Sequence, residues 1–458
     1  MVLHSDTIVA LSTPPGRSGI GVIRVSGAGS LGILRLLVAS DSFDPQPNLL
    51  TLRNLFDPQS GETIDEALVC YFKAPHSFTG EDLVELHCHG SPVLLREVID
   101  IVLQAGARMA EPGEFSLRAV AHGRLKLAEA EAIRDLIHAQ TDAALRQANR
   151  QLKGEISNAL QPAKDELLKI IVRLESSLEF VEDDLPSVES QTISGELKRV
   201  RTLLAELAGT FRQGKLLREG LKVAFVGRPN VGKSSLFNRL LGHSRAIVTE
   251  IPGTTRDTIT EAIGLDGVPV VLIDTAGLRA AADEIESIGV ARTRRAAADA
   301  DLLIVVIDGS EPLKEEDRSV LAEVADTKFI VTVNKIDLPT FSLTDFDSVA
   351  SEVSSPIIPV SAKTEAGLES LRAAILQPFA NGAHHGESLL ITNARHHDLL
   401  LRAVDAIDSS ADLLGKGTSE ELILVGLHNA LRYLDEITGE TTTEEILGQI
   451  FSTFCIGK

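Results

Sequence analysis

The chain has 458 residues, of which 44% are hydrophobic and 4% aromatic, with no tryptophan. This length accommodates about three domains, and the composition is typical of a soluble protein. The formal charge of −21 argues against strong sequence-independent binding of nucleic acid, so any RNA contact requires a local basic patch or a partner.

Neither a membrane span nor a targeting segment is expected. No apolar run approaches the roughly 20 residues that cross a bilayer. The segment MVLHSDTIVAL lacks the features of a secretion signal and of an import presequence. Three cysteines, Cys70, Cys88 and Cys455, are too scattered for a disulfide framework. The predicted location is therefore a reducing bacterial cytoplasm.

Residues 1–118 show a mixed α/β pattern. Candidate strands are Thr7–Leu11, Ile20–Val25, Ala67–Phe72 and Leu83–His89, and a helix is predicted over Pro92–Ala107. In the last of these strands, alternation places Cys88 opposite His87 and His89. No second ligand pair follows at zinc spacing, so a metal site is disfavoured.

Helical periodicity dominates from Leu125 to about Lys215 and returns after residue 390. Amphipathic stripes such as that of Leu167, Ile171 and Leu174 predict a helical bundle, and Gln213-Gly214-Lys215 resembles a helix exit. Strands and helices alternate over 220–378, as in a doubly wound sheet. We therefore expect an N-terminal domain (1–118), a helical domain in two parts (119–217 and 380–458) and a nucleotide domain inserted between them (218–379).

The inserted domain begins with a phosphate-binding loop. The sequence LKVAFVGRPNVGKS contains an apolar strand, then Gly227 and Gly232 bracketing four residues, then Lys233 and Ser234. The strand before and the helix after the motif are the context that supports a P-loop. Lys233 is expected to reach the β- and γ-phosphates, and Ser234 to supply a hydroxyl to Mg²⁺.

Three further motifs follow in the order that a GTPase requires. Asp274-Thr275-Ala276-Gly277 is expected to hold Mg²⁺ through water and to meet the γ-phosphate. Asn334-Lys335-Ile336-Asp337 predicts guanine recognition, because the Asp337 carboxylate can accept two hydrogen bonds that guanine offers and adenine does not. Ser361-Ala362-Lys363 is expected to lie behind the base. Together the motifs predict GTP rather than ATP.

The motifs predict the position of switch I but leave several candidates for the group that activates water. Switch I is predicted at Thr249–Asp257, with a threonine that closes over Mg²⁺. Leu278 follows Gly277 where many small GTPases carry a water-orienting glutamine, so another group must serve. Candidates are Arg279 and the acidic residues Asp283, Glu284 and Glu286, although a solvated helix start explains the acidic run equally well. A monovalent cation near Asn230 is a further candidate.

Motifs along the whole chain resemble the MnmE (TrmE) family of tRNA modification GTPases. They are TPPGRSGIGVIRVSG, HSFTGED, PGEFS, GRPNVGKSS, GTTRD, DTAGLR and the terminal FCIGK. The resemblance implies an N-terminal α+β domain similar to folate-binding domains, a helical domain and an inserted P-loop GTPase domain. It also implies a homodimer held by the N-terminal domain and a heterotetramer-type complex with the FAD-containing partner MnmG.

The function that the resemblance implies is K⁺-stimulated GTP hydrolysis coupled to tRNA modification. An aminomethyl or carboxymethylaminomethyl group is added to C5 of the wobble uridine of certain tRNAs. The one-carbon unit comes from 5,10-methylene- or 5-formyl-tetrahydrofolate. The alternatives are an RNA-binding or ribosome-assembly switch GTPase and a membrane-remodelling GTPase, but neither a basic RNA module nor a lipid-binding element is visible.

The resemblance also assigns residues. Asn230, Thr249, Ile251 and Thr254 match K⁺ ligands, Ser234 and Thr255 match Mg²⁺ ligands, and Glu286 matches the residue that orients water. The nucleotide-binding set adds Val231, Gly232, Lys233, Ser235, Glu250, Pro252, Gly253, Asp274, Thr275, Ala276, Gly277, Asn334, Lys335, Asp337, Ser361, Ala362 and Lys363. Folate contacts map to Arg24, Glu81, Arg124 and Lys458, as basic anchors for the glutamate tail and a carboxylate for the pterin.

Three positions of this chain need separate comment. Cys455 lies near a terminal lysine and is expected either to act as a nucleophile or, more in keeping with its place, to line the folate site. Arg124 stands where the family has lysine, which keeps the charge but alters the hydrogen-bond geometry. Lys126 stands where the family usually has aspartate.

Overall fold

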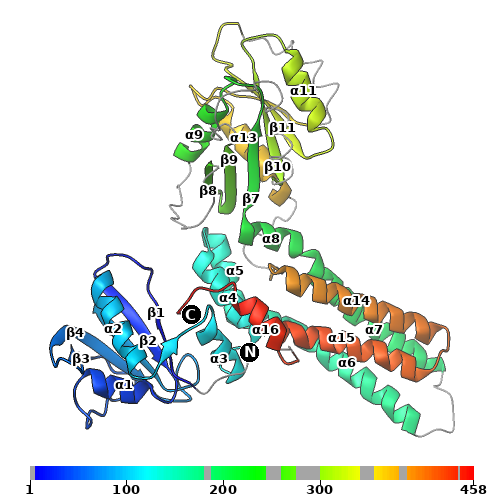
Figure 1. The fold of residues 1–458 in the computed structure, drawn as a ribbon. Helices are drawn as coiled ribbons and strands as arrows, with labels where there is room; N and C mark the ends of the chain where they lie inside the picture. Colours follow the sequence, from blue (N-terminus) through cyan, green and yellow to red (C-terminus); the bar gives the residue numbers. More distant parts are fainter. Residues whose placement is uncertain are drawn as a thin grey trace. The chain divides into compact units, whose positions relative to one another are not determined.

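The computed structural model describes residues 6–179, 187–243, 259–274, 300–340, 355–380, 389–441 and 444–457. The chain forms two compact units (Figure 1). The first comprises Met1–Ile137, Arg150–Arg201 and Arg402–Lys458, and the second comprises His138–Asn149 and Thr202–Leu401. No described helix is both long and apolar enough to span a membrane.

The first unit contains a six-stranded sheet in the order β3-β4-β5-β2-β1-β6. All neighbouring strands are antiparallel except β1 and β6. The strands are β1 (Ile8–Leu11), β2 (Ile20–Ser26), β3 (Thr51–Phe56), β4 (Thr63–Phe72), β5 (Leu83–His89) and β6 (Arg108–Met109). The four predicted strands are present, and β3 and β6 are additions.

Two helices pack on one face of this sheet, α1 (Ser30–Leu37) and α2 (Pro92–Gln104). Their apolar residues share a core with alternate residues of the strands, including Cys88. His87 and His89 lie outside this core, where they pair with Glu85 (3.3 Å) and Asp65 (2.7 Å). The predicted alternation of β5 is therefore confirmed.

The remaining helices of the first unit follow the predicted periodicity. Polar contacts join α6 to α7 (Arg173 to Glu196), α6 to α15 (Lys164 Nζ to Asp435, 2.6 Å) and α14 to α15. The helices are α3 (Glu114–Ala121), α4 (Leu127–His138), α5 (Asp142–Leu152), α6 (Glu155–Glu179), α7 (Ser187–Gly209), α14 (Ala394–Gly415), α15 (Glu420–Thr438) and α16 (Glu444–Phe451), with α5 and parts of α7 and α14 in the second unit.

The predicted helix exit at Gln213-Gly214-Lys215 is wrong. Helix α8 (Phe211–Glu219) runs through these residues and ends at Gly220. Gly214 is inside the helix because another segment approaches it closely, and a Cβ at this position would lie 2.1 Å from the backbone oxygen of Ile391. The glycine therefore serves close packing rather than helix termination.

The second unit contains a six-stranded sheet in the order β12-β11-β10-β7-β9-β8. Every neighbouring pair is parallel except β8 and β9. The elements are β7 (Leu221–Val226), α9 (Lys233–His243), β8 (Ile259–Leu265), β9 (Val268–Asp274), β10 (Leu302–Asp308), α11 (Glu315–Glu323), β11 (Phe329–Asn334), β12 (Ile357–Pro359) and α13 (Leu368–Ala380). This arrangement confirms the predicted doubly wound, mostly parallel sheet. The carboxyl ends of β7, β9, β10 and β11 lie at one edge, where such sheets bind ligands.

Candidate functional site

The phosphate loop connects β7 to α9 and is shaped by two glycines. Gly227 has φ +143°, and a Cβ there would lie 2.4 Å from the backbone oxygen of Val306. Gly232 has φ +97°, and its Cβ would lie 2.2 Å from the side-chain nitrogen of Asn334. Because only glycine fits these angles and spaces, the loop can lie against the ends of β10 and β11. It leads into the N-terminus of α9, where backbone N–H groups attract phosphate.

Lys233 points its ammonium group back into this loop. Its Nζ donates hydrogen bonds to the backbone oxygens of Gly227 (2.7 Å) and Arg228 (2.8 Å). Phosphate oxygens bound in the loop would be acceptors for the same group. On the other side of the loop, the backbone oxygen of Asn230 accepts a hydrogen bond from Lys335 Nζ (3.1 Å).

The structure brings Ser234 and Asp274 together, as a magnesium site requires. Ser234 Oγ donates a hydrogen bond to Asp274 Oδ2 over 3.1 Å, and Asp274 is buried at the carboxyl end of β9. Hydroxyl and carboxylate oxygens are ligands that Mg²⁺ prefers. The donor set therefore fits Mg²⁺, for which Ser234 would be a direct ligand and Asp274 would act through water.

Asn334 joins the phosphate loop to the loop that follows β12. Its Nδ2 donates to the backbone oxygen of Val231 (2.9 Å), and its Oδ1 accepts from the backbone N–H of Ala362 (3.1 Å). The Asp337 carboxylate accepts a hydrogen bond from the Ser361 hydroxyl (2.7 Å). The two motifs predicted to read the base are therefore in direct contact.

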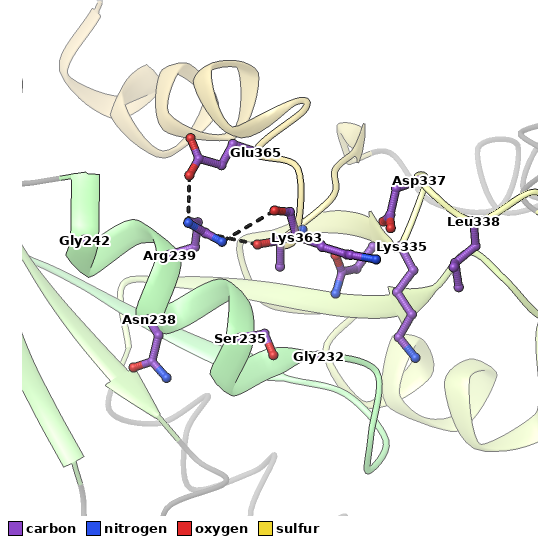
Figure 2. Close-up of a pocket in the computed structure, with 12 residues that line it drawn as sticks. Gly232, Ser235, Asn238, Arg239, Gly242, Lys335, Asp337, Leu338, Lys363 and Glu365 are labelled. Atoms are coloured by element: carbon purple, nitrogen blue, oxygen red, sulfur yellow. Dashed lines mark hydrogen bonds and ion pairs between the residues drawn. The ribbon is translucent and has the colours of Figure 1, made fainter.

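A cavity of about 740 Å³ opens beside these residues, within the range of small-molecule sites. Figure 2 shows Asp337, Lys335 and Leu338 on one side and α9 on the other. The predicted nucleotide-binding residues that line it are Gly232, Ser235, Asn334, Lys335, Asp337, Ala362 and Lys363. The lining includes both Gly232 of the phosphate loop and Asp337, as a nucleotide with its base at Asp337 would require.

Two residues that support this site were not predicted from the sequence. Arg239 on α9 donates to the backbone oxygen of Ala362 (3.0 Å) and pairs with Glu365 (2.7 Å), so it fixes the loop behind the base (Figure 2). Asp308 at the end of β10 pairs with Lys335 (2.5 Å). Burial alone would raise the pKa of Asp308, but hydrogen bonds from Lys335 and Ser310 bring it below its ordinary value. Neither residue belongs to a sequence motif from which its contact could have been predicted.

Three of the predicted folate residues lie around one segment of the first unit, residues 73–82. Arg24 on β2 lies over the Phe78 ring (5.5 Å), and Arg124 Nε donates to the backbone oxygen of Ser77 (3.0 Å). Glu81 belongs to the segment itself and accepts a hydrogen bond from Ser26 Oγ (2.8 Å). We call these residues the N-domain cluster.

The end of the chain contacts the N-domain cluster. The backbone oxygen of Gly457 accepts hydrogen bonds from Arg24 Nη1 (3.3 Å) and Ser12 Oγ (3.2 Å). The backbone oxygen of Cys455 accepts one from the Gly113 N–H (3.3 Å), and the Cys455 thiol is exposed. Gly457 thus lies beside Arg24, one of the residues that the resemblance relates to folate.

Comparison with known proteins settles the family. A model described as "MnmE helical domain" matches residues 127–455, and one described as "GTP-binding protein TrmE N-terminus" matches residues 7–124. The tRNA modification GTPase MnmE of Koribacter versatilis (strain Ellin345) is 46% identical over 456 residues, which cover 99% of each chain. The protein of the same name from Aquifex aeolicus (strain VF5) is 43% identical over 455 residues, covering 99% of this chain and 100% of the relative. The chain belongs to the MnmE family.

Family membership confirms the resemblance and the predicted enzyme class, a GTP hydrolase of tRNA modification. Among solved structures, the G domain of the T. maritima FeoB iron transporter is 31% identical, with a TM-score of 0.27. That match covers 34% of this chain and 97% of the other.

Several site residues, predicted either from the GTPase motifs or from the MnmE resemblance, lie outside the described residues. They are Thr249, Glu250, Ile251, Pro252, Gly253, Thr254, Thr255, Thr275, Ala276, Gly277, Arg279, Glu286 and Lys458. The two departures from the MnmE pattern are described. Arg124 donates a hydrogen bond to the backbone oxygen of Ser77. Lys126 precedes α4, and its N–H donates to the Glu129 carboxylate (2.9 Å), so that Glu129 caps the start of the helix.

A buried ion network adjoins the N-domain cluster and centres on α3. Glu114 pairs with Arg108 (2.5 Å) and Arg118 (2.9 Å), and both arginines also pair with Asp6 (2.6 and 2.9 Å). Burial alone would raise the pKa of Glu114, but hydrogen bonds from Arg108, from the Glu111 N–H and from Arg118 bring it below its ordinary value. The pairs of Glu114 with Arg108 and Arg118 stabilise the first unit only while Glu114 is ionised.

This network predicts a loss of stability in acid. Because the pKa of Glu114 is lower in the folded chain, its contribution is complete above the unfolded pKa of about 4.5 and is lost as the pH falls through the folded value. Glu114→Gln should lower the free energy of unfolding by about 3–5 kcal/mol near neutral pH, because two guanidinium groups lose a buried charged partner. The variant should lose less of its remaining stability in acid. Calorimetry of both proteins at about pH 7 and about pH 4 measures this difference, and parallel pH curves would contradict it.

Proposed function

We propose that this chain is a K⁺-stimulated GTPase that works with the FAD-containing partner MnmG in tRNA modification. The product is an aminomethyl-type group on C5 of the wobble uridine, built from a tetrahydrofolate one-carbon unit. The observation that carries the proposal is the hydrogen bond from Arg24 Nη1 to the backbone oxygen of Gly457, because it brings the segment that contains Cys455 to the N-domain cluster. The proposed domains remain 1–118, 119–217 with 380–458, and 218–379.

For GTP, the proposed roles follow from the contacts of the phosphate loop. Lys233 exchanges its backbone partners for phosphate oxygens, and Ser234 holds Mg²⁺ with Thr255. K⁺, held by Asn230, Thr249, Ile251 and Thr254, supplies positive charge to the phosphates. Asn230 has φ +65°, a left-handed backbone angle that asparagine tolerates better than most residues with a side chain. Because Leu278 cannot orient water, Glu286 is the proposed residue for that step, with Arg279 as a second candidate.

For folate, the proposed roles follow from charge. Arg24, Arg124 and Lys458 attract the glutamate tail, and Glu81 accepts hydrogen bonds from the amino edge of the pterin. Arg24 is already engaged with Glu85 (2.7 Å), which holds its guanidinium in place beside Phe78. Cys455 lines this site; its exposed thiol also leaves the nucleophile role open to test.

The exposed face of the N-terminal sheet supports the proposed homodimer. Strand β3 is at the edge of the sheet, and Leu52 is paired with Leu68 of β4. Leu52 and Leu68 are 52% and 39% exposed, on the face opposite the helix-covered core residues Ala67 and Val69, and Leu50 is 52% exposed. An apolar edge strand of this kind favours a partner, and here the proposed partner is a second copy of the chain.

A charge at this edge should dissociate the dimer. Leu52→Lys is expected to convert a dimer into a monomer in sedimentation experiments, because a lysine cannot be desolvated in an apolar interface at low cost. Leu36→Lys on α1 is the matched control, since Leu36 is also exposed (43%) but lies on a helix. A wild-type monomer, or a dimer that survives Leu52→Lys, would contradict the proposal.

The decisive experiment measures nucleosides by mass spectrometry in tRNA from a strain that lacks this protein. Loss of the wobble-uridine modification, restored by the wild-type chain but not by Asp337→Asn, is expected. If Cys455→Ser restores the modification, Cys455 lines the folate site and does not act as a nucleophile. Hydrolysis rates in K⁺ and Na⁺ buffers test the cation proposal separately. If the uridines remain modified after deletion, the alternative of a switch GTPase in RNA binding or ribosome assembly is favoured.

A further inference from the structure

Arg118, a residue that the proposed function does not use, lies at the centre of the network beside the N-domain cluster. Its side chain is 1% exposed, although arginine is almost never fully buried without partners. Its Nη1 donates to the backbone oxygen of Asp6 (2.8 Å), and its Nη2 donates to the carboxylates of Asp6 and Glu114 (2.9 Å each). The guanidinium group is thus fixed in both position and orientation.

The same guanidinium group contacts Glu81. Arg118 Nη1 lies 3.1 Å from both carboxylate oxygens of Glu81, and Ser26 Oγ donates to Oε2 from the other side (2.8 Å). Ser26 in turn shares a hydrogen bond with the buried Thr79 (2.7 Å). These contacts hold the Glu81 carboxylate in one orientation. It is also partly exposed (17%), so it can meet a ligand.

The charges of the network favour ligand binding at Glu81. Three carboxylates, Asp6, Glu81 and Glu114, face two guanidinium groups, those of Arg108 and Arg118. Glu114, which is buried, and Asp6 each accept three hydrogen bonds from the arginines through their carboxylates, whereas Glu81 accepts two, both from the single nitrogen Nη1 of Arg118. The Glu81 carboxylate therefore keeps acceptor capacity for donors outside the network, such as the amino group and ring N–H of a pterin.

We propose that Arg118 is a positioning residue for tetrahydrofolate binding, which holds the Glu81 carboxylate in the plane that the pterin's amino edge requires. The inference rests on the proposed function, in which Glu81 contacts the pterin. Bidentate pairing with two N–H donors depends on the direction of both oxygens, so a carboxylate that is free to rotate binds more weakly. Arg118 itself does not touch the ligand.

The test compares two ligands that differ in the pterin. One is 5-formyltetrahydrofolate; the other is p-aminobenzoyl-glutamate, which keeps the tail and lacks the pterin. Binding is measured by titration calorimetry, because the chain has no tryptophan to report on it. Arg118→Met should weaken binding of the first ligand about 10- to 100-fold and change the second by less than about twofold. Arg118→Lys should recover part of the loss, because it restores the charge but not the planar geometry.

A double-mutant cycle shows whether Arg118 acts through Glu81. In a Glu81→Gln background, Arg118→Met should cause no further loss of 5-formyltetrahydrofolate affinity. Arg35→Met is the matched control. Arg35 belongs to the same domain and pairs with Asp44, and neither residue belongs to the N-domain cluster. Thermal melting checks that each variant folds, and if Arg118→Met does not, Arg118→Lys is taken through the same cycle.

The outcomes separate the two proposals. If the wild-type chain does not bind 5-formyltetrahydrofolate, the folate proposal fails and this inference falls with it. If the wild type binds and Glu81→Gln weakens binding but Arg118→Met does not, only the positioning role is overturned. It is also overturned if Arg118→Met weakens both ligands equally, or if its effect persists without the Glu81 carboxylate, because either result indicates a general structural role.

Discussion

Asp337→Asn is expected to lower the affinity for GTP about 100-fold or more and to create affinity for xanthosine triphosphate. The Asp337 carboxylate lies at the cavity, fixed by the Ser361 hydroxyl (2.7 Å), and can accept hydrogen bonds from guanine N1–H and its amino group. Each charge-assisted bond is worth about 1.5–3 kcal/mol. An asparagine amide offers a donor in place of one acceptor, which matches the second carbonyl oxygen of xanthine and opposes the guanine amino group.

Equilibrium binding of fluorescent GTP and xanthosine triphosphate measures both parts of this prediction. Asp326→Asn is the matched control, because it removes an exposed carboxylate of the same domain that does not line the cavity. An Asp337→Asn variant that binds GTP as the wild type does would show that the base lies elsewhere. Loss of GTP binding without any gain for xanthosine triphosphate would instead indicate a collapsed site.

Lys233→Met should reduce GTP hydrolysis about 1,000-fold. Removing one preorganised donor to a developing charge costs about 100- to 1,000-fold, and Lys233 brings a full charge as well. The structure shows its ammonium group already inside the loop, bound to the oxygens of Gly227 and Arg228. Lys233→Arg should not rescue the rate, because a planar guanidinium group is too large for the position that a compact ammonium occupies.

Single-turnover hydrolysis under saturating GTP gives the rate without the effect on binding. Lys222→Met serves as the control, since Lys222 is an exposed lysine at the start of β7, the strand whose other end leads into the phosphate loop. A rate for Lys233→Met within about tenfold of wild type would mean that Lys233 does not act on the phosphates.

The features that were predicted correctly depend on residues that are close together in the sequence. The phosphate loop was predictable because two glycines, a lysine and a serine at fixed spacing have one structural use. The same holds for Asp337, since its motif follows a strand of the same sheet. The alternation of β5 also depends on neighbouring residues only, and it correctly separated Cys88 from His87.

The parts that escaped prediction depend on tertiary neighbours. Gly214 resembled a helix end, but its reason is the backbone of Ile391, about 180 residues away. No local pattern singles out Arg239 or Arg118, and only the folded chain shows that one supports the loop at Ala362 and the other is buried against Glu81. Strand β3 was missed because its two leucines, the exposed Leu52 and the buried Leu55, do not follow the alternation of apolar and polar residues that marks a strand.

The amide of Asn334 has a consequence for how nucleotide leaves. One end of this buried group is bonded to the segment under the phosphates and the other to the segment under the base, so its two bonds cannot be kept if either segment shifts alone. A movement of the phosphate loop should therefore also displace the loop behind the base, and a movement of that loop should displace the phosphate loop. Exchange of GDP for GTP should consequently proceed as one concerted release, without a half-bound state that retains only the base.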